Sequence, residues 1–197
     1  MPPGALAILA LTCLVSLIGL VAPQVIARAL FRPYWLVRRA EYVRLVTSGF
    51  VHADLGHLLF NAITFYSFAF SLERYIGTRQ FLALYFSGLL LGNIGTYFKH
   101  LADPNYASLG ASGAILAVMF ASIVYFPSQR LIIIPIPVPV PAPLFALGYL
   151  AFTYYSARQS RDKINHDAHL GGALTGLAFV AVTDPAAYGN LLTSVLG

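Results

Sequence analysis

Six apolar stretches divide the sequence, and most of them are close to the length that crosses a lipid bilayer. A spanning helix needs about 20 mostly apolar residues, and in lipid it satisfies its own backbone hydrogen bonds. We expect transmembrane helices over 4–22, 56–72, 80–98, 112–127, 141–155 and 168–184. The pattern predicts an all-α polytopic membrane protein, with one domain over residues 1–197.

The charge content agrees with this expectation and excludes several classes of partner. Only 10% of the residues are charged and the mean hydropathy is +0.74, whereas soluble domains carry about 25% charged residues. The net charge is +5, but no dense Lys/Arg block suggests nucleic acid. The single cysteine, Cys13, lies in an apolar run without a nearby histidine or acid. We therefore expect no metal site and no cofactor.

Two connecting stretches have unusual sequences. Residues 24–54 interleave arginines with aromatic residues, which is typical of the membrane–water interface. We expect this long first loop to be partly helical and half embedded, with Glu41 and Arg44 close enough to pair. Proline recurs at every second position from Pro135 to Pro143, which excludes a regular helix. Residues 130–140 should form an extended loop at the membrane surface.

Polar side chains inside spans are costly and therefore mark candidate sites. Ser112 lies among small residues at the start of the fourth span, in Gly110-Ala111-Ser112-Gly113-Ala114. Such clusters serve helix packing, but they also leave a nucleophile accessible. His57 and Asn61 are four residues apart and share a helical face. They either tie helices together or donate hydrogen bonds to a developing oxyanion.

Counting the spans places three of these groups at a similar depth. The second, fourth and sixth spans start on the same membrane side, so His57, Ser112 and His169 should lie near one surface. A serine nucleophile needs a base within hydrogen-bond reach, and His169 is the better placed histidine. No Asp or Glu lies inside an expected span, so a Ser–His dyad is predicted and not a triad. His166 is interpreted as a loop residue and the less favoured base, and His100 is given no role.

Taken together, these motifs resemble the rhomboid intramembrane serine proteases. The resemblance covers most of the chain, in the minimal six-helix bacterial or archaeal form, with the motifs in the right order on the right spans. The matching residues are Gly110-x-Ser112-Gly113, Ala168-His169-x-x-Gly172 with Gly176, His57-x-x-x-Asn61 preceded by His52, Glu41-x-x-Arg44, and Glu73-Arg74.

The resemblance implies a role for each matching position. Ser112 would be the nucleophile and His169 its general base, while His57, Asn61 and the Ser112 backbone N–H would bind the oxyanion. Structural support would come from Gly110, Gly113, Gly172, Gly176, Glu41, Arg44 and His52, with the two glycines of span six allowing it to lie against span four. The family cleaves transmembrane segments of other membrane proteins through an acyl-enzyme, so the expected partners are such substrates and the bilayer. The loop 156–167 would cap the site.

Two positions depart from the family pattern, and two other functions stay open. Leu116 stands where some bacterial members carry a tyrosine, and Val43 stands where many members carry a tryptophan. The alternatives are an inactive relative that binds membrane proteins without cutting them, and a six-span transporter.

Two arguments about membrane orientation conflict. Nine basic residues are expected on the side of the site, namely Arg28, Arg32, Arg38, Arg39, Arg44, Lys99, Arg158, Arg161 and Lys163; three are expected opposite, namely Arg74, Arg79 and Arg130. The positive-inside rule would place the site in the cytoplasm. The resemblance implies an extracytoplasmic site in a prokaryotic plasma membrane, and this is the orientation that we expect because five of the nine lie in the folded first loop.

Overall fold

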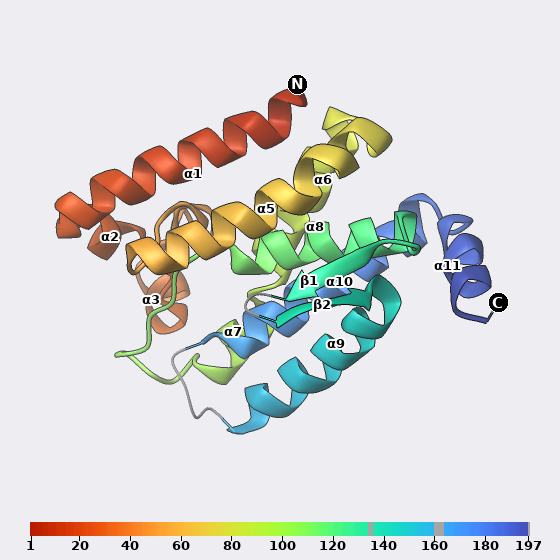
Figure 1. Cartoon of the computed structure of the whole chain (residues 1–197). Coiled ribbons are helices and arrows are strands. Elements are labelled where there is room, and N and C mark those ends of the chain that lie inside the picture. The colour runs from red at the N-terminus through yellow and green to blue at the C-terminus, as the bar shows by residue number, and fades with distance from the viewer. Residues whose placement is uncertain (134–135, 160–163, 197) are drawn as a thin grey trace.

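A computed structural model describes residues 1–133, 136–159 and 164–196. Figure 1 shows an assembly of helices with one small β-hairpin. The elements are α1 (Pro3–Val21), α2 (Pro23–Ala29), α3 (Pro33–Arg38), α4 (Arg44–Thr47), the 3-10 helix η1 (Ser48–Phe50), α5 (Leu55–Ile76), α6 (Thr78–Leu91), α7 (Ile94–Lys99), α8 (Ser112–Tyr125), β1 (Arg130–Ile133), β2 (Ile136–Pro141), α9 (Ala142–Gln159), α10 (His166–Thr183) and α11 (Ala187–Leu196).

Helix α8 forms the core of the molecule. Its residues from Gly113 to Val124 are all buried, as expected for a helix that is apolar all round. Helices α5, α6 and α10 pack directly against it, α1 lies along the outer side of α5, and α9 contacts α10 (Figure 1). The element that begins with Ser112 is therefore enclosed by its neighbours.

Glycines allow α10 to lie directly against α8. A Cβ atom on Gly172 would overlap the carbonyl group of Gly113, and one on Gly176 would overlap that of Ala117. Gly88 of α6 meets Ala117 from another side in the same way. These contacts have the small-residue character of tightly packed membrane helices.

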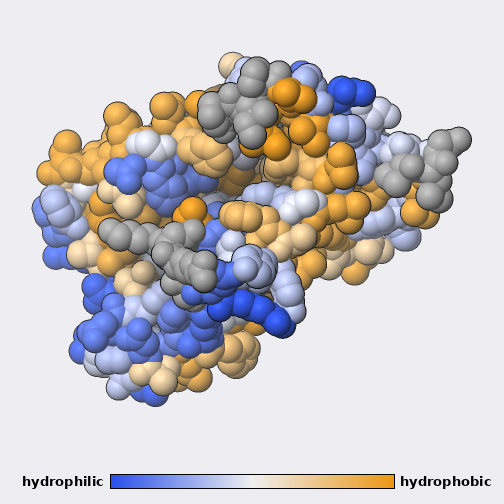
Figure 2. Space-filling model, turned by 60° about the horizontal axis from the view of Figure 1, so that its bottom comes forward, coloured by the Kyte–Doolittle hydropathy of each residue, from blue (hydrophilic) through white to orange (hydrophobic). Residues whose placement is uncertain are grey.

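Several helices are long and apolar enough to span a membrane, although the expected count of six is not established. Within the described residues, α1, α5 and the stretch Thr78–Lys99 meet that test, and α10 with α11 forms a fourth, bent by 119°. Helix α8 is apolar but shorter. The space-filling view of Figure 2 shows apolar residues over much of the visible face and hydrophilic residues gathered towards its left and lower side. Large exposed apolar side chains such as Leu14, Phe60 and Leu147 suit contact with lipid.

The ends of the expected spans need correction. The second span runs to Ile76 and not to 72, because it ends at Gly77, whose positive φ of 81° stops the helix. The third is broken at Gly92 and Asn93 into α6 and α7. The fifth begins and ends later than 141–155, the sixth begins two residues before 168, and α11 was not expected at all.

Glu73 corrects a second expectation, that no acid lies inside a span. It is buried in the last turns of α5 and accepts hydrogen bonds from the backbone N–H groups of Gly4 and Ala5 at 2.9 and 2.6 Å. The Thr78 hydroxyl donates to the same carboxylate at 2.7 Å. The first N–H groups of a helix have no partners within it, and Glu73 accepts hydrogen bonds from two of them at the start of α1. Its carboxylate also lies at the positive end of the α1 dipole, which is stabilising.

The first loop is folded, as expected. It contains α2, α3, α4 and η1, and the Arg44 Nε lies 2.9 Å from Glu41 Oε2. The Arg44 guanidinium also donates to the carbonyl oxygens of Ala27 and Leu30 at 3.1 and 3.2 Å. This one side chain thus links α4 to the segment around α2.

The proline-rich stretch forms an antiparallel hairpin and not a simple loop. Strand β1 pairs with β2 from Arg130 opposite Pro141 to Ile133 opposite Ile136. Proline cannot donate to a ladder and is tolerated at a sheet edge, and both strands of a two-stranded sheet are edges. The extended conformation was predictable, whereas the pairing was not. Residues 134–135 lie outside the described part, as do residues 160–163 of the expected capping loop, which include Arg161 and Lys163.

Candidate active site

The starts of α8 and α10 bring Ser112 and His169 together. Ser112 is the first residue of α8, and His169 lies in the first turn of α10. Their side chains are joined by a hydrogen bond of 2.8 Å between Ser112 Oγ and His169 Nε2. The close glycine packing between the two helices permits this distance, because larger residues would hold the helices apart. The geometry is the one that a serine nucleophile and its general base require.

The other ring nitrogen of His169 is also engaged. The hydroxyl oxygen of Tyr149, on α9, lies 3.1 Å from His169 Nδ1. Sequence reasoning missed Tyr149, whose only signal is a hydroxyl group in an otherwise apolar stretch. Leu116, at the position where family members carry a tyrosine, is buried in the core of α8.

His57 and Asn61 face the chain just before Ser112. A Cβ atom added to Gly110 would lie 3.0 Å from His57 Nε2 and 4.0 Å from Asn61 Nδ2. Gly110 has a φ of +110°, which side-chain-bearing residues rarely adopt. Asn61 is buried, and its Nδ2 has no hydrogen-bond partner among the described residues. A buried donor without a partner is rare and requires an explanation.

His52 holds a position behind His57. Its Nδ1 lies 2.8 Å from Ser16 Oγ, and the Ser16 hydroxyl donates to the Phe50 carbonyl at 3.0 Å. Because the Ser16 hydroxyl donates to Phe50, its oxygen accepts a hydrogen bond from the Nδ1–H group of His52. The two histidine rings meet edge to face, 4.8 Å apart. Burial, followed by the nearby His57, lowers the pKa of His52 to about 4, and Asp54 partly opposes both effects.

Backbone hydrogen bonds fasten the segment that leads into α8 to the first loop. Phe31 and Ser108 exchange two N–H···O bonds of 2.9 Å each, and Gly110 N–H donates to the Ser48 carbonyl at 2.9 Å. These contacts fix the course of the chain on both sides of Leu109. These contacts could not be predicted from the sequence, because backbone pairing between distant loops depends on the completed fold.

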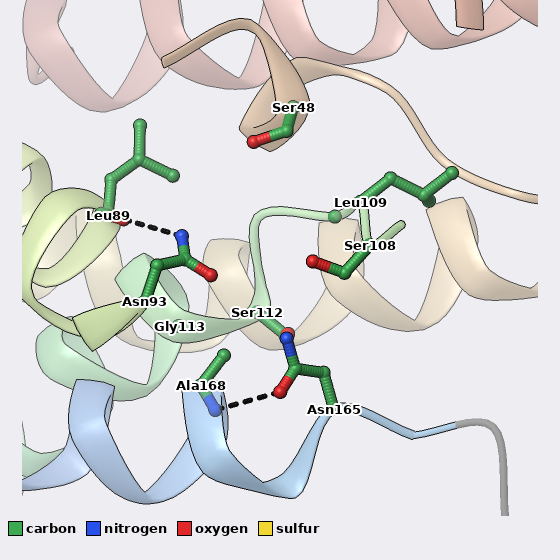
Figure 3. Close-up of a pocket in the computed structure, with 10 residues that line it drawn as sticks. Ser48, Leu89, Asn93, Ser108, Leu109, Ser112, Gly113, Asn165 and Ala168 are labelled. Carbon is green, nitrogen blue, oxygen red and sulfur yellow. Dashed lines mark hydrogen bonds between the residues drawn. The ribbon is translucent and has the colours of Figure 1, made fainter. Parts of the chain in front are cut away.

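A small polar cavity lies beside Ser112 (Figure 3). Its volume is about 10 Å³, near the minimum that holds one water molecule. Polar members of its lining come from four parts of the chain: Ser48, Asn93, Ser108 and Asn165. Asn165 also accepts from Ala168 N–H at 3.1 Å and from the Thr96 hydroxyl at 2.8 Å, so it fixes the start of α10.

The remaining histidines make ring contacts with other residues. His166 is not a loop residue as expected, because it is buried and begins α10. Its ring meets that of His169 edge to face at 5.9 Å. His100 follows α7 and stacks on Tyr106 with the ring centroids 3.5 Å apart. The other departure from the family pattern, Val43, is largely exposed.

Comparison with known protein families shows which family the chain belongs to. The Rhomboid domain matches residues 39–185, which is more than half of the chain. The chain belongs to the rhomboid family. The match includes the positions from Glu41 to Gly176 that the sequence motifs singled out, and it leaves α1 and its Ser16 outside.

Individual relatives of this rhomboid come from bacteria and from eukaryotes. The "Putative rhomboid protease YdcA" of Bacillus subtilis (strain 168) is 43% identical over 82 residues, 42% of this chain and 40% of the relative. The human "Presenilin-associated rhomboid-like protein, mitochondrial" is 35% identical over 138 residues, 69% of this chain and 36% of the relative. The "RHOMBOID-like protein 12, mitochondrial" of Arabidopsis thaliana is 33% identical over 144 residues, which are 66% of this chain and 43% of the relative. The matches thus span about two fifths of each relative.

Proposed function

We propose that this rhomboid is an intramembrane serine endopeptidase that cleaves transmembrane segments of other membrane proteins. The observation that carries the proposal is the 2.8 Å hydrogen bond between Ser112 Oγ and His169 Nε2. It lies at the start of two helices in a polytopic membrane protein. Asn61, whose Nδ2 has no hydrogen-bond partner among the described residues, faces Gly110 just before Ser112. A serine without an adjacent base is a poor nucleophile, so the pairing supports catalysis more directly than the serine motif alone.

The proposed reaction proceeds in two halves. His169 Nε2 takes the Ser112 proton while Oγ attacks the substrate carbonyl carbon, which gives a tetrahedral oxyanion. His57, Asn61 and the Ser112 backbone N–H donate hydrogen bonds to that oxyanion. His169 then protonates the leaving amine, and the acyl-enzyme forms. A water molecule, deprotonated by His169, attacks the ester carbonyl and releases Ser112.

The same proposal includes six membrane crossings and a site on the extracytoplasmic side of a prokaryotic plasma membrane. The contacts of α5, α8 and α10 around Ser112 support a shared side for the starts of these helices. Orientation is tested with a cysteine introduced at Asp103 after Cys13 is replaced by alanine. Labelling by an impermeant reagent from outside supports the proposal, and access only from the cytoplasm contradicts it.

Cleavage of a transmembrane substrate tests the function itself. The purified protein should cut such a substrate, and Ser112→Ala should not. Substrate binding without cleavage by either protein would favour the inactive binding protein instead. Neither binding nor cleavage, together with solute uptake in reconstituted vesicles, would favour a transporter.

A further inference from the structure

We propose that Tyr149 is a positioning residue that fixes the tautomer and the ring orientation of His169 from a third helix. The inference rests on the proposed function, and it concerns the contact that keeps the proposed base in its working tautomer. In a Ser–His–Asp triad an aspartate holds the distal ring nitrogen. Here the hydroxyl of Tyr149 lies 3.1 Å from that nitrogen, Nδ1.

The acidic residue nearest to His169 along the chain forms an ion pair with a lysine. Asp167, two residues before His169, pairs with the Lys99 ammonium group at 2.8 Å. The same ammonium donates to the Ala157 carbonyl at 2.7 Å. This pair therefore joins α7, α9 and the start of α10, and its carboxylate does not replace the aspartate of a triad.

The position of the Tyr149 ring is set by other aromatic rings. Its ring stacks on Phe145, one turn earlier on α9, at 5.6 Å and an interplanar angle of 26°. It also lies 6.0 Å from the ring of Phe120 on α8. Because these contacts hold the ring, its hydroxyl is directed at His169 without the entropy cost of ordering a free side chain.

The hydrogen-bond inventory then assigns the proton. A neutral imidazole has one donor and one acceptor nitrogen, whereas a tyrosine hydroxyl can act in either way. A general base must accept the Ser112 proton at Nε2, so the other nitrogen, Nδ1, carries hydrogen and donates to Tyr149 Oη. The phenol oxygen thus accepts the hydrogen bond that an aspartate carboxylate accepts in a Ser–His–Asp triad. With Leu116 on α8 offering no polar group, the partner comes from α9.

The first test reads the tautomer directly. Nitrogen-15 spectra of histidine-labelled protein, with the His169 signals assigned by their loss in His169→Asn, should show hydrogen on Nδ1 at neutral pH. In Tyr149→Phe the signal should become a mixture of tautomers. A wild-type spectrum with the hydrogen on Nε2 would overturn the inference, and this reading does not depend on activity.

The second test separates positioning from packing. Tyr149→Phe removes one oxygen and keeps the ring, and we expect kcat to fall about tenfold, the factor of one lost hydrogen bond, with KM and the melting temperature unchanged. Tyr155→Phe is the matched control, because Tyr155 is on the same helix and 65% exposed. Wild-type kcat in Tyr149→Phe, or a change in KM alone, would contradict the inference. A wild-type protein that cuts nothing would instead contradict the proposed function.

Discussion

At the scale of single residues, the dyad should be visible without any substrate. A serine-directed covalent probe, such as a fluorophosphonate, is expected to label Ser112, because His169 Nε2 lies within hydrogen-bond distance of its hydroxyl. His169→Ala should remove the labelling and His166→Ala should preserve it, as followed by gel fluorescence and mass spectrometry. Labelling that survives the first change and is lost in the second would transfer the role of base to His166.

Replacing one proposed oxyanion donor should lower turnover less than replacing a member of the proposed dyad. Loss of one such donor costs about 2.7–4 kcal/mol, or roughly 10²–10³ in turnover. Asn61→Ala and His57→Ala should therefore be slow but measurable, while Ser112→Ala and His169→Ala should be inactive. Because Asn61 Nδ2 has no hydrogen-bond partner in the described part of the chain, Asn61→Ala should lose activity with little change in melting temperature. Full turnover combined with earlier melting would instead identify Asn61 as a packing residue.

His52 should make the stability of the protein depend on pH. The pKa of His52 is lowered from 6.5 to about 4 in the folded protein, so the fold favours the neutral ring. The contribution is fully present above pH 6.5 and is lost as the pH falls towards 4, because the unfolded chain takes up the proton first. Melting curves of wild type and His52→Asn at pH 7 and pH 5 test this. The wild type should lose more stability than the variant over that interval, and equal losses would contradict the assignment.

At the scale of elements, the contact between α8 and α10 should tolerate no added atom. Gly172→Ala places a methyl group on the Gly113 carbonyl, so α10 must move away and carry His169 with it. We expect loss of most activity, together with a lower melting temperature. Gly148→Ala is the matched control, since a Cβ on Gly148 meets nothing within 4 Å. Equal behaviour of the two variants would show that close packing does not position the base.

The elements also show what sequence reasoning can and cannot reach. Sequence reasoning could select the candidate site residues because polar groups stand out in apolar stretches, and because the order of the spans determines which helix starts share a side. These residues are Ser112, His169, His57 and Asn61. The break at Gly92 and the pairing of β1 with β2 depend on neighbouring elements and leave no periodic signal. The same holds for individual side chains. Glu73 follows directly after an expected span, and its hydrogen bonds to the first N–H groups of α1 depend on how the two helices pack.

At the scale of the whole molecule, the contacts of α8 with α5 determine how deep the serine lies. Tyr75, near the end of α5, packs against Tyr125 at the end of α8, with their rings 5.1 Å apart. At the other end, Asn61 faces Gly110, two residues before Ser112. Six residues of α5 precede Asn61 from Leu55, and at 1.5 Å per residue Asn61 lies about 9 Å along the helix from its start. Because Asn61 faces Gly110, the start of α8 lies inward from that end of α5.

The short central helix should make the proposed activity depend on the thickness of the bilayer. The 14 residues of α8 extend about 21 Å, against about 30 Å of hydrocarbon in a typical bilayer. Because α8 is enclosed by α5, α6 and α10, the bilayer contacts the longer helices around it, and a thinner bilayer brings its surface nearer to the start of α8. With shorter acyl chains the serine should lie closer to bulk water, and kcat/KM for a single substrate should rise as vesicles are made thinner. The thickness of the host membrane would then act on the proposed activity as a kinetic variable, just as temperature and pH do.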